Sequence, residues 1–211
     1  METGRHAHPF PYTARDELEQ QAVRLAPGRL TPRVTLARAA ASSWVLRFAP
    51  LIAPGGEVLD LACGQGRHTR LFLERGHPVT AVDVDLSGVA DLIDEPRLEA
   101  REHDLEDGGP FPLSGRRFAA VVVTSYLHRP LLSALVEAVA LGGVLIYETF
   151  ARGNERFGHP RSPRFLLEPG ELLDAVRGRL RVVAYEDLVV GSPRAAAVQR
   201  ICAVRERALP A

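Results

Sequence analysis

The 211-residue sequence lacks a long hydrophobic run: no window approaches about 18 uninterrupted apolar residues, so we expect no membrane-spanning helix. Residues 1–21 also lack the apolar core that a signal peptide needs. Only two cysteines are present, Cys63 and Cys202, and they predict neither a disulfide framework nor a metal site. Since nothing requires an oxidising compartment, we expect a cytoplasmic protein.

The sequence also lacks an excess of either charge. Lys+Arg and Asp+Glu both total 26, which gives a formal net charge of zero. This balance argues against a global attraction to nucleic acid or to an acidic membrane, so we expect neither as a partner. The composition, 46% hydrophobic and 25% charged, is that of a globular protein of one well-buried domain, and it makes no prediction of oligomeric state.

Two regions differ in their patterning. Residues 1–34 are interrupted by prolines, and we expect either an N-terminal arm or cap over a site, or a loosely ordered leader. Residues 35–206 form the expected main domain, in which helical and extended patterns alternate. The predicted strands are 57–62, 78–82, 97–102 at a sheet edge, 118–124 and 143–149, and the predicted helices are 35–49, 67–75, 86–93, 130–140 and 169–177. This alternation predicts an α/β fold with a mostly parallel sheet and helices on both faces.

The end of the main domain breaks this alternation. Residues 180–190 and 196–205 are two extended runs separated by a short turn that contains Gly191, Ser192 and Pro193. Such a pair predicts a C-terminal antiparallel hairpin.

A glycine-rich turn follows the first predicted strand, in VLDLACGQGRHTRLF. Gly64 and Gly66 let the backbone approach a ligand closely, and the next helix presents unpaired N–H groups. This predicts a nucleotide-type cofactor site at the carboxyl edge of the sheet. The dinucleotide fingerprint places a third glycine where Thr69 stands. The carboxylate of Asp60 instead favours a positively charged ligand such as S-adenosylmethionine (SAM), which carries an ammonium and a sulfonium and no phosphate.

Acidic residues also follow the next two predicted strands. Asp83 ends the second strand, where its carboxylate can accept both ribose hydroxyls and Val84 can pack on adenine. Asp85 competes for this role, but Asp83 directly ends the apolar run; the alternative is that Asp83 only caps the next turn. Asp104, with Leu105 beside it, is expected near the adenine amino group.

The segment VLDLACGQGRHTRLFLERGHPVTAVDVD resembles the first two motifs of class I SAM-dependent methyltransferases. It is similar to the small bacterial tellurite-resistance-type methyltransferases, which carry a DLGCGQGR segment; here Ala62 replaces the usual first glycine. The resemblance covers roughly Thr35–Glu206 and implies a Rossmann-like sheet of seven strands that ends in an antiparallel hairpin. We read Cys63 as a small buried side chain rather than a nucleophile. The expected SAM-binding residues are Asp60, Ala62, Cys63, Gly64, Gly66, Asp83, Val84, Asp104 and Leu105.

Substrates of such sheets lie beyond the ends of the fourth and fifth strands. The fourth ends in VVVTSYLHRPLL, which is expected to place Ser125, Tyr126, His128 and Arg129 near the transferred methyl group. His128 and Tyr126 are the catalytic candidates: the imidazole as a base, and the phenol ring to position the acceptor or to line the sulfonium. The alternative is that these polar residues cap the helix near Pro130.

A long connection, FARGNERFGHPRSPRFLLEPGEL, follows the fifth strand. A connection of this length inside a domain is usually functional or disordered. Phe150, Phe157 and Phe165 predict an apolar underside and hence an ordered lid, and Glu148 and Asn154 are further polar groups expected to face the acceptor. Four arginines are available either for an anionic acceptor, such as a carboxylate, or for solvent: Arg152, Arg156, Arg161 and Arg164.

The leading hypothesis is therefore methyl transfer to a small molecule, since no appended recognition module or basic arm is visible. One alternative is a nicotinamide-dependent Rossmann oxidoreductase, which Thr69 and the terminal hairpin disfavour. A second is a non-catalytic SAM-binding protein. No metal site is expected, because His6 and His8 lack cysteine or carboxylate partners nearby.

Overall fold

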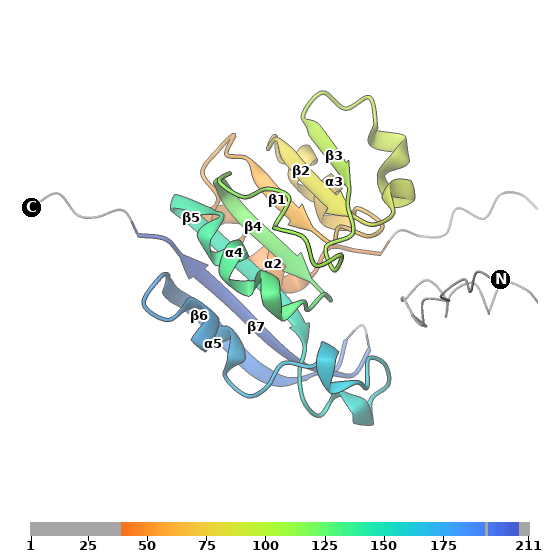
Figure 1. Ribbon diagram of the computed structural model, residues 1–211, viewed down its shortest axis with the longest axis vertical. Helices are drawn as coiled ribbons and strands as arrows, with labels where there is room; N and C mark the ends of the chain where they lie inside the picture. The colour runs from red at the N-terminus through yellow and green to blue at the C-terminus, as the bar shows by residue number, and fades with distance from the viewer. Residues whose placement is uncertain (1–38, 193, 207–211) are drawn as a thin grey trace, which may run out of the picture. The chain divides into compact units, whose positions relative to one another are not determined.

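A computed structural model describes residues 39–192 and 194–206, which form a seven-stranded sheet with helices on both faces (Figure 1). The expected N-terminal arm or cap at 1–34 lies outside the described residues. The strands are β1 (Val58–Leu61), β2 (Val79–Asp83), β3 (Leu98–Glu102), β4 (Phe118–Thr124), β5 (Val139–Phe150), β6 (Arg181–Val190) and β7 (Ala196–Val204).

The sheet has the order β3-β2-β1-β4-β5-β7-β6. Strands β1 to β5 run parallel, and β7 pairs antiparallel with both β5 and β6. The predicted mostly parallel sheet, its polar edge strand β3 and the C-terminal hairpin are all confirmed.

The helices are α2 (Ser43–Phe48), α3 (Arg67–Glu74), α4 (Leu132–Glu137) and α5 (Glu171–Val176), with 3₁₀ turns η1 (Ala49–Leu51), η2 (Leu86–Leu92), η3 (Arg129–Leu131), η4 (Asn154–Arg156) and η5 (Pro163–Phe165). The prediction of a helix from residue 35 is wrong over residues 39–42. The helix begins at Ser43 because the Oγ of Ser42 accepts hydrogen bonds from the N–H groups of Trp44 and Val45. The predicted helix 130–140 also ends early, since β5 begins at Val139.

Two apolar clusters cover the two faces of the sheet. One gathers Leu59, Val121 and Tyr147 under α4 and α5. The other gathers Val58 and Val122 under α2 and α3. Both faces are covered, so the central strands read as continuous apolar runs in the sequence.

The strand register defines the edge that carries the site. Leu61 of β1 pairs with Val82 of β2 and with Val123 of β4, so the carboxyl ends of these three strands are level. The loops that leave this edge hold the candidate residues.

Candidate active site

The loop between β1 and α3 is built on left-handed backbone. Gly64 and Gly66 have φ of 51° and 69°. A Cβ on Gly66 would lie 2.4 Å from Cγ1 of Val89, so this position needs glycine. Ala62 also has a positive φ, 53°. Because alanine stands here in place of the usual glycine, its side chain is held in a strained region of backbone conformation.

Asp60 lies beneath this loop and is only 2% exposed. Its Oδ2 accepts a 2.6 Å hydrogen bond from the hydroxyl of Thr69. Burial raises the pKa of Asp60 to about 6, against the lowering effects of Thr69 and Arg67. Thr69, which replaces the third glycine of the dinucleotide pattern, thus orients this acid.

Asp83 joins the end of β2 to the loop. Its Oδ2 accepts a 2.8 Å hydrogen bond from the backbone N–H of Gly64, and burial raises the pKa of the carboxyl. The competing candidate Asp85 accepts a hydrogen bond from the N–H of Ser87 at 2.8 Å and caps η2 instead. Asp83 is therefore the acid that contacts the glycine loop, and Val84 beside it is 60% exposed.

Asp104 lies in the loop after β3. Its Oδ1 accepts from the N–H of Glu106 at 2.9 Å, while Leu105 packs partly against the apolar cluster under α4. The backbone N–H of His103 donates to the carbonyl of Asp83 at 2.8 Å, so this loop runs beside the end of β2.

Tyr126 and His128 follow β4 as predicted. The hydroxyl of Tyr126 is buried and makes no hydrogen bond of good geometry among the described residues, although the carboxylate of Glu106 interacts with it. Burial raises the pKa of Tyr126, and the negative charges of Glu106, Asp104 and Asp83 raise it further. The Nδ1 of His128 lies 3.8 Å from Oε2 of Glu106. Glu106 was missed in the sequence because acids are common in loops such as EHDLED.

Arg129 does not keep a free guanidinium at the acceptor, which corrects its expected role. Its Nε and Nη2 donate to the two carboxylate oxygens of Glu171 at 2.7 and 2.9 Å. Its remaining donors reach the carbonyls of Arg164 and Leu166 at 2.9 and 2.8 Å. Arg129 therefore ties the loop after β4 to the end of the connection that follows β5.

That connection, residues 151–167, is ordered, but not on a phenylalanine underside. Phe157 and Phe165 are 40% and 37% exposed, whereas Leu166 and Leu167 are fully buried. Leu167 forms a bridge to Ala151, which directs these leucines inward and closes the base of the connection. The expected apolar underside is thus wrong for these two phenylalanines.

The polar residues of this connection also have specific contacts. Asn154 is 1% exposed and donates to the carbonyl of Pro160 at 3.0 Å, so it stabilises the turn rather than facing an acceptor. Arg152 pairs with Glu168 at 3.2 Å, and Arg164 lies over the ring of Phe165. Arg156 and Arg161, the remaining two arginines, are exposed.

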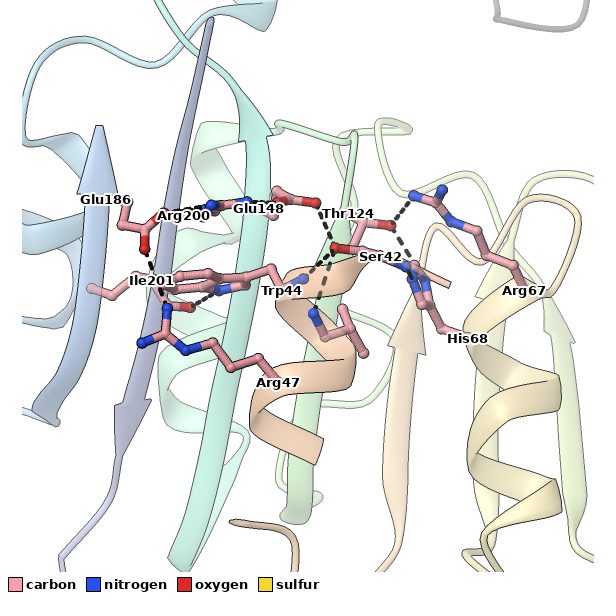
Figure 2. Close-up of polar contacts among 11 residues, drawn as sticks. Ser42, Trp44, Arg47, Arg67, His68, Thr124, Glu148, Glu186, Arg200 and Ile201 are labelled. Carbon is pink, nitrogen blue, oxygen red and sulfur yellow. Dashed lines mark hydrogen bonds and ion pairs between the residues drawn. The ribbon is translucent and has the colours of Figure 1, made fainter. Parts of the chain in front are cut away.

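Glu148 at the end of β5 also has internal partners, so the expectation that it faces the acceptor is wrong. It accepts from the Oγ of Ser42 at 2.8 Å and from Nη1 of Arg200 at 3.2 Å (Figure 2). These bonds hold the start of α2 against the sheet.

Arg67 and His68, the first residues of α3, directly follow the glycine loop, and the sequence did not single them out. Nη2 of Arg67 donates to Oγ1 of Thr124 at 3.3 Å, and Nε2 of His68 accepts from the N–H of Ser42 at 3.1 Å (Figure 2). Their position directly after Gly66 was the available signal, since the first helical turn after such a loop faces the ligand.

The strand order, the terminal hairpin and the acid-flanked glycine loop are those expected from the resemblance to class I methyltransferases. Consistently, residues 58–141 match the model of a methyltransferase domain. The chain is 33% identical over 106 residues to the malonyl-[acyl-carrier protein] O-methyltransferase of Serratia marcescens, covering 48% of this chain and 41% of the relative. The chain thus spans about two fifths of the length of the curated relatives it matches.

Solved structures share the fold. TehB from Haemophilus influenzae superposes with a TM-score of 0.63 at 18% identity, covering 77% of this chain and 61% of that chain. The 1,6-didemethyltoxoflavin-N1-methyltransferase of Burkholderia thailandensis, with bound 1,6-didemethyltoxoflavin and S-adenosylhomocysteine, superposes at 0.58 and 21% identity, covering 78% and 76%. Residues 58–141 are thus similar to a methyltransferase domain, and the described fold resembles that of TehB.

Proposed function

We propose that the chain is a SAM-dependent methyltransferase that transfers a methyl group to a small-molecule acceptor. The observation that carries the proposal is the Asp83 carboxylate bound to the N–H of Gly64, which joins an acid to the glycine loop at the carboxyl edge of the sheet. The match of residues 58–141 to a methyltransferase domain supports it.

The residues present fit SAM. A carboxylate at Asp83 suits the ribose hydroxyls, and exposed Val84 offers an apolar surface for adenine. Asp60, Asp83 and Asp104 give this edge a negative charge that complements a sulfonium and an ammonium. SAM contains no phosphate, so the loop needs no third glycine at Thr69.

The strand order disfavours the nicotinamide alternative. Dinucleotide-binding Rossmann sheets have the parallel order 3-2-1-4-5-6. Here the antiparallel strand β7 lies between β5 and β6.

SAM, when bound, supplies a methyl group on a positively charged sulfur. The chain's contribution is to hold the acceptor in line with that methyl group. We assign this role to Tyr126, whose buried hydroxyl makes no hydrogen bond of good geometry among the described residues. For an acceptor that loses a proton, we assign the role of proton acceptor to His128, whose Nδ1 lies 3.8 Å from Oε2 of Glu106.

We further propose that an anionic group on the acceptor is met by Arg156 and Arg161, whose side chains are exposed on the connection after β5. No helix among the described residues is long and apolar enough to cross a membrane. We propose a cytoplasmic location, which the free, buried thiols of Cys63 and Cys202 support. Burial raises the pKa of Cys202 to about 12 and that of Cys63 still further, so both thiols are unreactive.

Calorimetric titration with S-adenosylhomocysteine tests the cofactor assignment. Asp83→Ala is expected to weaken binding about 10- to 100-fold, because it removes charge-assisted hydrogen bonds to the ribose. The matched control is Asp94→Ala, which removes an exposed acid and should leave the affinity unchanged. Equal affinities in both variants would refute the role of Asp83.

Catalysis is tested separately, with labelled SAM and a panel of small acceptors. Tyr126→Phe and His128→Gln are expected to bind S-adenosylhomocysteine normally and to lose turnover. A wild-type protein that binds the cofactor but methylates no acceptor would favour a non-catalytic SAM-binding protein.

A further inference from the structure

Glu106 lies on the loop after β3, yet its side chain faces a residue that follows β4. Two strands, β2 and β1, separate β3 from β4 in the sheet. Three strand spacings amount to about 14 Å. The Oε2 of Glu106 nevertheless lies only 3.8 Å from Nδ1 of His128. The loop after β3 therefore reaches past the ends of β2 and β1, beside the glycine loop, to the end of β4.

The backbone holds Glu106 in this position, while its charge has no strong partner. Its N–H donates to Oδ1 of Asp104 at 2.9 Å, and the N–H of His103 before it donates to the carbonyl of Asp83 at 2.8 Å. Among the residues that the structure describes, no arginine forms an ion pair with the Glu106 carboxylate, and the side chain is 29% exposed. A carboxylate that is largely removed from water without a cationic partner favours the approach of a positively charged group.

Tyr126 brings a second polar group to the same place. Its hydroxyl is buried and makes no hydrogen bond of good geometry with the described residues, although the Glu106 carboxylate interacts with it. The negative charges of Asp104 and Asp83 act on the same phenol. The surroundings of this hydroxyl are therefore acidic, which disfavours a carboxylate or phenolate as the nucleophile and favours a nitrogen that gains positive charge.

We propose that Glu106, with the hydroxyl of Tyr126, forms a cation subsite on the acceptor side of the site and selects an amine as the nucleophile. The inference rests on the proposed function. His128 holds the proton that the ammonium form of the acceptor loses. Methyl transfer to the resulting amine forms a nitrogen–carbon bond, breaks the carbon–sulfur bond and leaves its electron pair on sulfur. Positive charge thus passes from sulfur to nitrogen, where the Glu106 carboxylate stabilises it.

This assignment concerns the nucleophile alone. An anionic group that Arg156 and Arg161 meet belongs to another part of the acceptor. The acceptor class that follows is a primary or secondary amine, methylated on nitrogen.

The test measures binding and needs no knowledge of the acceptor. Sinefungin has a carbon that bears an amino group in place of the methylated sulfur of SAM, whereas S-adenosylhomocysteine has no nitrogen at this position. Both ligands are titrated by calorimetry into the wild type, Glu106→Gln, Glu106→Asp and Glu137→Gln. Glu137 is an exposed acid that ends α4 just before β5 begins, so its substitution makes the same charge change at the opposite edge of the sheet. Thermal melting of each variant checks folding, and Glu106→Asp keeps the charge if Glu106→Gln does not fold.

The wild type is expected to bind sinefungin more tightly than S-adenosylhomocysteine. Glu106→Gln should weaken sinefungin about 10- to 100-fold, the range for one charge-assisted interaction, and change S-adenosylhomocysteine by less than about twofold. Glu106→Asp should keep part of the preference for sinefungin, and Glu137→Gln should change neither ligand. An equal loss for both ligands, or no loss for either, overturns the inference while the cofactor assignment stands. A wild type that binds neither ligand overturns the proposed function itself.

A second readout tests the acceptor class. Amines are compared with carboxylates of matched carbon skeleton, benzylamine with benzoate and propylamine with propionate, in turnover assays with labelled SAM. We expect the label to pass to the amines in preference to the carboxylates. Preferential labelling of the carboxylates overturns the inference and leaves methyl transfer itself intact.

Discussion

Protonation of Asp60 should control both the stability of the protein and its affinity for the cofactor. The carboxyl is 2% exposed beneath the glycine loop, and burial raises its pKa from 3.8 to about 6. Because the folded-state pKa exceeds the unfolded value, the folded protein prefers the protonated form. The contribution of Asp60 to the free energy of unfolding is therefore most favourable below pH 4 and falls as pH rises from about 4 to about 6.

The size of this effect follows from the shift. About two pKa units correspond to about 3 kcal/mol, which is an upper estimate for the cost of keeping Asp60 ionised at pH 8. Asp60→Asn keeps an acceptor for the hydroxyl of Thr69 and removes the charge, so it should stabilise the ligand-free protein at pH 8 by about 1–3 kcal/mol. At pH 5 the two proteins should differ by much less.

Cofactor binding should show the opposite dependence on pH. If the ionised carboxylate attracts the ammonium of the ligand, then at pH 5 only about a tenth of the protein is competent, and the Kd for S-adenosylhomocysteine rises about tenfold relative to pH 8. Asp60→Asn should bind more weakly at pH 8 and respond less to pH. Calorimetric titration at both pH values measures this difference. A wild-type affinity independent of pH, or an equal pH response in the variant, would refute the role given to the Asp60 charge.

Three further perturbations follow from the geometry. Ala62→Gly should raise the free energy of unfolding by up to about 1 kcal/mol, because it removes a side chain at a φ of 53°; a destabilised variant in thermal denaturation would contradict this strain. Ser42→Ala should cost about 1–2 kcal/mol in chemical denaturation, since the hydroxyl both caps α2 and donates to Glu148; an unchanged midpoint would refute both contributions. Arg129→Ala should speed hydrogen exchange at residues 163–167, which lose their carbonyl contacts, and leave exchange in β1 unchanged; a uniform response would contradict a local tie.

Much of the fold could be predicted because its signals are local. The apolar run 118–124 and the glycines that follow β1 determine a buried strand and a tight turn within a few residues. The start of α2 was harder to predict from the sequence. A serine marks the start of a helix only where its side chain folds back to cap the first turn, as Ser42 does here.

The acids expected at the cofactor could also be found from local patterns, since Asp60 lies one residue before the end of β1 and Asp83 ends β2. The contacts of the residues expected near the acceptor depend on partners distant in the sequence. Ser42 and Glu148 are 106 residues apart, and Arg129 and Glu171 are 42 apart, so no local pattern could show that these polar groups are already bonded.

Titration of the wild-type chain with S-adenosylhomocysteine, in parallel with NADH, distinguishes the proposed cofactor from a nicotinamide cofactor. We expect saturable binding of S-adenosylhomocysteine at one site per chain and no measurable heat with NADH. Absence of S-adenosylhomocysteine binding, or a clear preference for NADH, would contradict the assignment of this domain to methyl transfer.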